Sequence, residues 1–244
     1  MLMNEVMLFE PVMQQSYLQK QFDRKFHPIA TITLVSPIEF FVKNAAKLYL
    51  DLNNSRYIVR CRIVKKDGTN MPAANACKSG VVNLLLHSLF KEVTVLFNNK
   101  TVSDPSNMYA YCSYLVTLLN CNGDIRKHRL KSEGWHKDKH DKMDEADPKD
   151  NTGLVERRKY CAESPDIVLI GRPHADVFHI DKLIPPGIDG SVKFMPNDDK
   201  FCIMSSDGDN LGPTVVIDEM NLIISSCPKW QHFTQIKSIF LAFN

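Results

Sequence analysis

Hydrophobic and polar residues alternate along several short stretches of this chain, and this pattern predicts β-strands. The clearest stretch is RYIVRCRIVKK, which starts at Arg56. In an extended chain, one face of this stretch carries the apolar side chains of Tyr57, Val59, Cys61 and Ile63. The opposite face mixes apolar and charged groups, namely Ile58, Arg60, Arg62 and Val64. This period of two is typical of an antiparallel strand with one buried face, and the Asp67-Gly68 pair after it predicts a tight turn.

Another strand ends in a predicted hairpin. Residues 93–97 alternate in the same way, and Asn98 and Asn99 follow directly. Asparagine tolerates the positive φ angles of a two-residue turn, so we expect the return strand to begin at Thr101. ITLVSPIEFFV is also rich in branched and aromatic residues, and Pro37 within it fits an edge position or a bulge. Further strands are predicted in PDIVLIGRPHADVFHI, in SVKFM and on both sides of a Gly/Asp/Asn loop in KFCIMSSDGDNLGPTVVIDEMNLIISS.

A helix is predicted among these strands, in DPSNMYAYCSYLVTLLNCNG. Its apolar residues recur at helical spacing, and we expect them to form a packing face: Tyr111, Tyr114, Leu115 and Leu118. Ser106 or Asn107 is expected to cap the helix, and the pair Asn122-Gly123 to end it. GLVERRKYCAES predicts a second, short helix.

About eight strands with one or two inserted helices predict a mainly β fold, an antiparallel β-sandwich of the jelly-roll type or the immunoglobulin type. We assign residues 1–28 to an N-terminal arm, 29–226 to the sandwich domain and 227–244 to a divergent C-terminal tail. Residues 124–151 form a strongly polar excursion between strands, with charges of both signs interspersed. No apolar frame fixes these side chains, so a solvated loop is expected there.

Composition narrows the function. The formal net charge of the 244 residues is only +2, so we expect no specific nucleic-acid site. The seven cysteines are widely spaced without a CxxC pair, which favours free thiols in a reducing, intracellular setting. MLMNEVMLFEP has no basic region of a secretory signal, so we do not expect secretion. The longest apolar run, SGVVNLLLHSLF, is shorter than the roughly 20 residues that cross a bilayer.

Histidines and aspartates gather in GRPHADVFHID, residues 171–181. In a strand, His174 and Asp176 would lie on one face and His179 and Asp181 on the other. In a helix, the two histidines would lie about 140° apart. A metal site here therefore requires a turn within the stretch or donors from elsewhere in the chain. We interpret the stretch as a structural strand.

The polar excursion offers a second set of metal-binding residue types, namely His136, Asp138, His140 and Asp144. A solvated loop is the simpler interpretation of these residues. His87 is a polar group in an apolar run, which is typical of a hydrogen-bonded core histidine. Nucleophile, zinc-protease and phosphate-loop motifs are absent from the sequence. We therefore predict no enzyme activity and no catalytic, cofactor-binding or metal-binding residues.

Four stretches, in one order, resemble the major capsid proteins of Polinton (Maverick) elements and of adintoviruses. They are LLHSLFKEVTVLFNNKTVSDPSNMYAYCSYLVTLLN, WHKDKHDKMD, NTGLVERRKYCAESPDIVLIGRPHADVFHIDKLIPPGIDGSVKF and KFCIMS. The resemblance runs from about Pro37 to about Ser226. None of its motifs is catalytic.

This resemblance implies a structural protein without a cofactor, in which two jelly rolls form one subunit and three subunits form a pseudo-hexagonal capsomer of an icosahedral shell. The chain matches the first of the two jelly rolls. It is expected to be a shortened or host-genome-resident copy if the second is missing. The expected partners are copies of itself, neighbouring capsomers and a minor or penton capsid protein. The expected location is the virion capsid, or the cytoplasm or nucleus for a host-resident copy.

Two other functions stay open from the residues alone. One is a cellular binding module on the same sandwich, recruited for a host role. The other is a metal-dependent hydrolase, for which the candidate residues are His136, His140, His174 and His179. Saturable ligand binding by a monomer would favour the first, and one equivalent of bound metal would favour the second.

Overall fold

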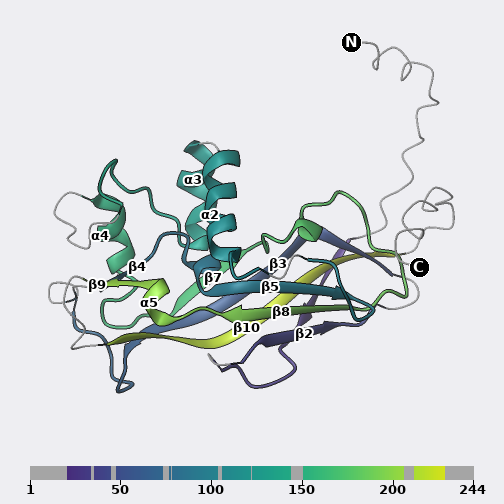
Figure 1. Ribbon diagram of the computed structural model, residues 1–244, viewed down its shortest axis with the longest axis horizontal. Coiled ribbons are helices and arrows are strands. Elements are labelled where there is room, and N and C mark those ends of the chain that lie inside the picture. The colour runs from purple at the N-terminus through teal and green to yellow at the C-terminus, as the bar shows by residue number, and fades with distance from the viewer. Residues whose placement is uncertain are drawn as a thin grey trace, which may run out of the picture.

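The computed structural model describes residues 21–33, 36–44, 48–73, 77, 79–103, 106–121, 123–143, 151–205 and 212–228. Ten strands lie in these ranges: β1 (Phe22–Phe26), β2 (Ile38–Val42), β3 (Leu48–Lys65), β4 (Ser79–Val81), β5 (Phe90–Phe97), β6 (Lys100–Thr101), β7 (Ile167–Gly171), β8 (Gly190–Pro196), β9 (Ile203–Ser205) and β10 (Pro213–Pro228). Eight of them form two antiparallel sheets, ordered β1-β10-β3-β7 and β2-β8-β5-β6 (Figure 1). The short strands β4 and β9 pair separately.

The strand order defines the fold. Among the eight strands of the two sheets, the first pairs with the last (β1 with β10) and the second with the second-last (β2 with β8). The third pairs with the third-last (β3 with β7), and the middle two, β5 and β6, pair with each other. One long hairpin rolled into two sheets produces this order, which is that of a jelly roll. The predicted jelly-roll sandwich is therefore confirmed, and the immunoglobulin alternative is wrong.

The core lies between the two sheets, and β3 supplies the inward face that the sequence predicts. Tyr57, Val59, Cys61 and Ile63 are fully buried. On the outward face, Arg62 donates from Nε and Nη2 to the two carboxylate oxygens of Asp218 on β10, both at 2.9 Å. The turn after β3 is also confirmed, with Gly68 at a φ of 81°.

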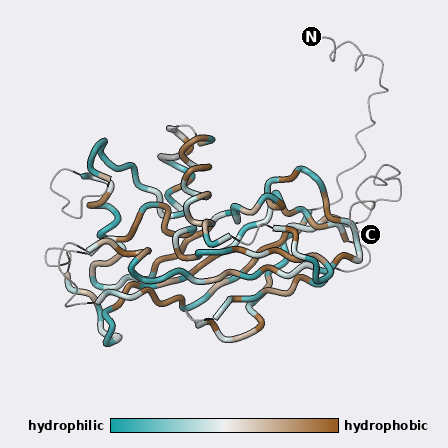
Figure 2. The backbone as a smooth tube through the Cα atoms, in the orientation of Figure 1, coloured by the Kyte–Doolittle hydropathy of each residue, from teal (hydrophilic) through white to brown (hydrophobic). Residues whose placement is uncertain are grey.

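Aromatic rings from both sheets fill the centre of the core. The ring of Phe194 on β8 lies 5.1 Å from those of Tyr57 on β3 and Phe90 on β5, and 5.9 Å from that of Phe40 on β2, measured between centroids. These separations are the usual ones for edge-to-face and tilted aromatic pairs. Figure 2 shows hydrophobic residues along the strands of the sandwich. The β5–β6 hairpin is also confirmed, because Asn98 and Asn99 have φ angles of 46° and 65°.

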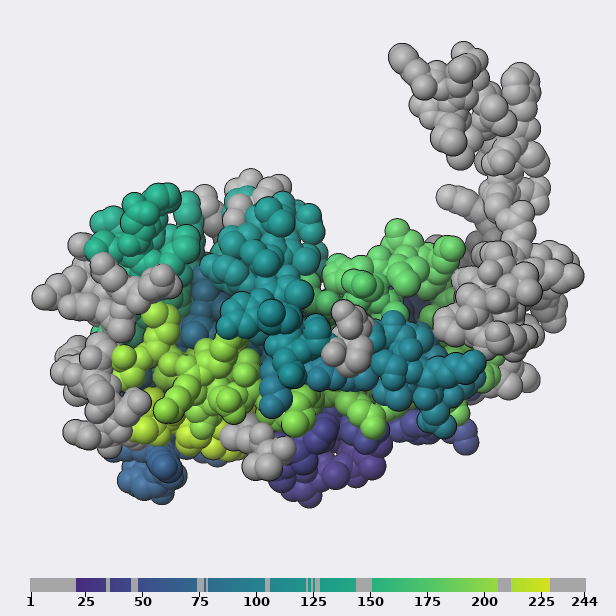
Figure 3. Space-filling view, viewed as in Figure 1, coloured from purple at the N-terminus to yellow at the C-terminus, as the bar shows by residue number. Residues whose placement is uncertain are grey.

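Helical segments occupy the connections between strands. They are α1 (Leu85–Ser88), α2 (Tyr109–Asn120), α3 (Gly123–His128), η2 (Arg129–Glu133), α4 (Thr152–Arg158), η3 (Asp176–Phe178) and α5 (Asp199–Cys202). α2, α3 and α4 rise from one side of the sandwich, as the space-filling view also shows (Figures 1 and 3). α4 is the predicted second helix, and the side chain of Asn151 caps it by accepting from the backbone N–H groups of Gly153 and Leu154.

α2 confirms the predicted helix and half of its predicted packing face, because Tyr114 and Leu118 pack against the cluster of Leu84, Leu130 and Trp135 whereas Tyr111 and Leu115 do not. Its buried residues are Tyr109, Ala110, Ser113 and Thr117. Tyr111 and Leu115 of the predicted face are each 56% exposed. Three of the four buried positions carry small side chains, which let the helix backbone approach its neighbours closely. Met108 occupies the N-cap position in place of Ser106 or Asn107, and the helix ends before Asn122.

The solvated loop expected over residues 124–151 is wrong for much of the described part. The chain forms most of α3 and η2 there, and Leu130, Glu133 and Trp135 are buried. The ring of Trp135 lies 5.5 Å from that of Tyr114, between centroids, so part of the excursion packs beneath α2. Residues 144–150 lie outside the described residues.

The folded part extends beyond the limits assigned from the sequence. Residues 22–26, which we assigned to the N-terminal arm, form β1 and pair with β10 in register from Phe22 with Ser226 to Phe26 with Leu222. β10 itself runs to Pro228, two residues into the expected tail. The rest of that tail, 229–244, and residues 1–20 of the arm lie outside the described residues.

Candidate functional site

GRPHADVFHID is not the continuous strand that we predicted. β7 ends at Gly171, and the 3₁₀ turn η3 follows five residues later. Gly171 has a specific packing role, because a Cβ atom at this position would lie 2.5 Å from Leu86 Cδ2 and 2.9 Å from Glu133 Cγ. The absent side chain leaves space for these two residues at the end of β7, where the chain turns.

The break in the stretch brings His174 together with residues from distant parts of the chain. One ligand atom each of His87, Glu133 and His174 lie within 4.8 Å of one another. The ring of His179 is close to this group, 5.4 Å from that of His174 between centroids. Asp181 is engaged elsewhere, since it accepts a 2.7 Å hydrogen bond from Asn53. The cluster therefore combines His174 from this stretch with two residues, His87 and Glu133, that the sequence did not place near it.

His87 is the fully buried centre of this cluster. Its Nδ1 lies 2.9 Å from the hydroxyl of Tyr109 and 3.2 Å from that of Tyr57. Its Nε2 lies 3.3 Å from Oε2 of Glu133, which is 7% exposed. The prediction of a hydrogen-bonded core histidine is confirmed. The backbone N–H of His174 also donates to the Tyr109 hydroxyl, at 3.2 Å. The Tyr109 hydroxyl therefore contacts both His87 and His174.

Burial favours the uncharged forms of His174, His179 and Tyr109, which surround His87. Desolvation lowers the pKa of His174 to about 2, with further lowering by His87, His179 and Arg172. Desolvation and the charge of Arg172 also lower the pKa of His179. Burial raises the pKa of Tyr109 to about 12. Around neutral pH the site therefore offers neutral imidazole nitrogens and neutral phenols beside one carboxyl group, and such nitrogen and oxygen donors suit a cation.

The second set from the sequence does not converge. Nε2 of His136 lies 2.9 Å from the hydroxyl of Tyr160. Asp138 forms a buried ion pair with Arg157, with 2.7 Å between Oδ1 and Nη1. The side chain of His140 is 90% exposed and faces Asp141. Asp144 lies outside the described residues. Each of the described members has a different partner, so His136, Asp138 and His140 do not converge on one point.

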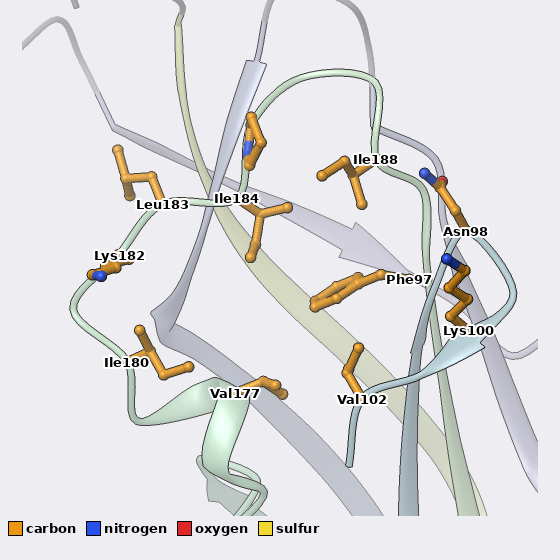
Figure 4. Close-up of a pocket in the computed structure, with 11 residues that line it drawn as sticks. Phe97, Asn98, Lys100, Val102, Val177, Ile180, Lys182, Leu183, Ile184 and Ile188 are labelled. Carbon is orange, nitrogen blue, oxygen red and sulfur yellow. The ribbon is translucent and has the colours of Figure 1, made fainter. Parts of the chain in front are cut away.

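An apolar cavity of about 360 Å³ opens at the β5–β6 hairpin (Figure 4). It lies between this hairpin and the segment that leads from η3 to β8. Its apolar lining consists of Phe97, Val102, Val177, Ile180, Leu183, Ile184, Pro185 and Ile188. Lys100 and Lys182 also contribute to the lining. Its volume lies within the range of roughly 300–1,000 Å³ that is usual for small-molecule pockets.

Two apolar surfaces are exposed on the outside of the molecule. The first, which we name the α2 stripe, consists of Met108, Tyr111, Leu115 and Leu119, and the last of these is 82% exposed. These residues recur at helical spacing and so lie along one face of the helix. The second, the β7 outer face, consists of Val168 and Ile170, which are 51% and 37% exposed on an edge strand. Adjacent exposed apolar residues of this kind are typical of protein interfaces.

The fold is similar to that of a chain in a solved virophage structure. No family model matches the chain, and no curated protein matches it. A chain of the Sputnik virophage, from an electron cryomicroscopy structure, superposes with a TM-score of 0.56 over 91% of this chain and 52% of its own length, at 10% identity. The mavirus major capsid protein aligns over 94% of this chain and 52% of its own, with 13% identity and a TM-score of 0.42. The Faustovirus major capsid protein aligns over 93% and 58%, with 8% identity and a TM-score of 0.48.

The likeness to the Sputnik chain establishes the fold, and at 10% identity it establishes no more than that. The chain spans about half the length of each of these three structures. Among the helices that the structure describes, none combines the length and the hydrophobicity needed to cross a lipid bilayer.

Proposed function

We propose that the chain is a structural capsid protein whose task is to contact copies of itself in a shell. The observation that carries this proposal is the jelly-roll strand order of the two sheets, in a fold of which 91% superposes on the Sputnik virophage chain. A jelly roll occurs with many functions, so the fold alone does not decide among them. The exposed apolar surfaces favour a protein that associates, because such surfaces are costly on a monomer.

The finer part of the proposal is that the chain is the first jelly roll of a double jelly-roll subunit of the Polinton and adintovirus kind. In support, the matched structures are about twice as long as the part that this chain covers. The sheet edge at β7 has no strand partner among the described residues and carries an apolar outer face. A second jelly roll or another subunit would cover such an edge. We propose trimeric capsomers, contacts with neighbouring capsomers and a penton protein, and a location in the virion capsid.

The mechanism is geometric and needs no chemical step. The two sheets with their aromatic core form a rigid wall, and the connections carry the surfaces that meet neighbours. The α2 stripe stands out from the sandwich, whereas the β7 outer face lies along a sheet edge (Figure 1). Removal of apolar area from water favours association, so both surfaces are suitable interfaces.

Light scattering after size-exclusion chromatography tests this proposal over a series of concentrations. The mass of a monomer is 27.8 kDa. We expect the measured mass of the wild-type chain to rise with concentration and to approach three times this value. The double variants V168K/I170K and L115K/L119K should shift the mass toward the monomer. The matched control is V155K, because Val155 is also apolar and is 43% exposed, but lies on α4. A wild-type chain that stays monomeric, with the circular dichroism of a folded β protein, contradicts the proposal.

The apolar cavity favours a second candidate function, a binding module on the same sandwich. A fluorescent apolar probe that binds the monomer saturably, and is displaced when Ile184 or Val102 is enlarged to Phe, would support it. Probe binding only to associated forms, or unchanged binding by both enlarged variants, argues for the shell protein alone.

A further inference from the structure

We propose that His87, Glu133 and His174 form a binding site for a divalent transition-metal ion, with Zn²⁺ as the best match. The three residues come from three connections: α1 before β5, η2 between β6 and β7, and the segment after β7. Two imidazoles and one carboxylate are a donor set of known zinc sites, in which a water molecule completes the coordination. The proposal does not depend on a role in a shell.

The distances are close to those of a coordinated ion. Zinc lies about 2.0–2.1 Å from its nitrogen and oxygen ligands, so neighbouring ligands of a tetrahedral site are about 3.3 Å apart. Nε2 of His87 and Oε2 of Glu133 are separated by 3.3 Å. The widest separation in the cluster is at most 4.8 Å, so binding requires an inward movement of no more than about 1.5 Å. A side-chain rotation of His174 covers such a distance without a change in the fold.

His174 carries the clearest sign of a missing partner. Its Nδ1 atom is buried and has no hydrogen-bond partner among the described residues. Buried polar atoms almost always have a partner, because an unpaired one has lost its hydrogen bonds to water without replacement. Glu133 beside it is a buried carboxyl group. A bound cation would satisfy both the nitrogen and the carboxylate.

The surroundings hold the three ligands in orientation. The Tyr109 hydroxyl contacts Nδ1 of His87 and accepts from the backbone of His174, so the Nε2 of His87 is directed at Glu133. A hydrogen bond to the far nitrogen of a ligating histidine is the rule in metal sites. Gly171 gives the side chain of Glu133 the space that it occupies. Arg172 is a nearby positive charge, but its Nη1 donates to the backbone oxygen of Asn53, at 3.1 Å.

The donor types decide the class of ion. Ca²⁺ takes six to eight oxygen ligands and Mg²⁺ about six, whereas imidazole favours zinc, copper, nickel and cobalt. The three ligands come from three connections between strands. Successive ligands are 46 and 41 residues apart in the sequence, so the ion would cross-link distant segments. We therefore expect it to stabilise this end of the jelly roll.

The experiment uses the untagged full chain, stripped with a chelator and then titrated with ZnCl₂ in a calorimeter. We expect saturation at one equivalent and a higher melting temperature in the presence of Zn²⁺. CoCl₂ serves as a spectroscopic probe, and visible absorption bands of low-coordinate Co²⁺ are expected. Binding by His140, which is exposed, is the main competing explanation.

Variants separate the two explanations. Tyr109→Phe removes a hydrogen bond to a ligand and should weaken zinc binding by about 10–100-fold. His174→Gln removes a ligand itself and should weaken zinc binding by more than about 100-fold. The control His140→Gln should bind like the wild type. Circular dichroism and the metal-free melting temperature show whether each variant folds. The proposal is overturned if the folded wild type does not saturate with Zn²⁺, or if binding survives His174→Gln and is lost in His140→Gln. Neither result bears on association of the chain, which the light-scattering test measures separately.

Discussion

Arg157 on α4 and Asp138 in the polar excursion form a buried ion pair. Nη1 of Arg157 lies 2.7 Å from Oδ1 of Asp138, and their side chains are 1% and 5% exposed. Nε of Arg157 also donates to the backbone oxygen of Val81, at 2.9 Å, and Nδ2 of Asn151 donates to Asp138, at 2.8 Å. The pair thus connects α4, β4 and the segment after Trp135. It explains why a stretch that is polar in sequence becomes ordered and packed.

Loss of one partner should be costly. Asp138→Ala leaves the Arg157 guanidinium buried without its carboxylate, and the free energy of unfolding should fall by about 3–5 kcal/mol. Urea unfolding followed by circular dichroism measures this. The matched control is Glu156→Ala, which removes the exposed pair of Glu156 with Lys159 and should cost less than about 1 kcal/mol. Equal effects of the two substitutions would contradict the structural role of the buried pair.

Two adjacent phenylalanines on β2 test the alternation of the sandwich. Phe40 is fully buried against Phe194, whereas Phe41 is 48% exposed. Phe40→Ala should lower the free energy of unfolding by about 3–5 kcal/mol, because it leaves a cavity in the aromatic core. Phe41→Ala removes the same atoms from a half-exposed position and should cost much less. If Phe41→Ala proved the more damaging change in urea unfolding, the inward and outward faces of β2 would be reversed.

The cysteines should differ sharply in reactivity. Burial raises the pKa of Cys61 and of Cys202 to about 12, so at pH 8 their reactive thiolates are scarce and enclosed. Cys112 on α2 is exposed. A thiol reagent followed by mass spectrometry should modify Cys112 in the native protein and reach Cys61 only after denaturation. Cys112→Ser should remove the fast phase of modification, and persistence of that phase would show that another thiol is open.

His136 should make stability depend on pH. Desolvation lowers the pKa of His136 below its ordinary value of 6.5. The unfolded chain therefore takes up a proton at a higher pH than the folded chain, and stability is lost as pH falls below 6.5. When the pH is lowered from 7.5 to 5.5, the free energy of unfolding should fall less for His136→Asn than for the wild type. His140→Asn, at an exposed position, should follow the wild type, and an equal change in its slope would locate the effect elsewhere.

Much of the sandwich follows from local patterns. The alternation in β3, β5 and β8 is visible in the sequence because each strand has one face toward a single core and one toward solvent. The turns at Asp67-Gly68 and Asn98-Asn99 are local as well, since the turn residues themselves determine the backbone angles.

Long-range packing was harder to predict. Apolar spacing on α2 indicates a helix, but the residues that bury are small ones such as Ala110 and Ser113, and a hydrophobicity pattern does not register them. The polarity of residues 124–151 predicted a solvated loop. The sequence does not show that Asp138 forms a buried ion pair with Arg157. β1 was missed because FDRKF is mostly polar, and its pairing with β10 is what makes it a strand.

The His87, Glu133 and His174 cluster was missed for a related reason. Its members are spread over separate connections, and no spacing rule joins them. The strand prediction for GRPHADVFHID also assumed that β7 continued, whereas Gly171 ends it. One signal was available: a turn within that stretch was the stated condition for a metal site, and such a turn is present at η3.

The pairing of β1 with β10 has a consequence for how the chain acquires its structure. Phe22 lies opposite Ser226, so one edge of the first sheet is completed by residues about 200 positions apart. Contacts of such high sequence separation slow folding, because a long loop must be closed before they form. During synthesis on the ribosome, β1 and β3 must wait for β10 to emerge before their sheet is complete. Until then their unpaired edges are open to other chains, so production of this protein should benefit from chaperones and from slow, cool expression.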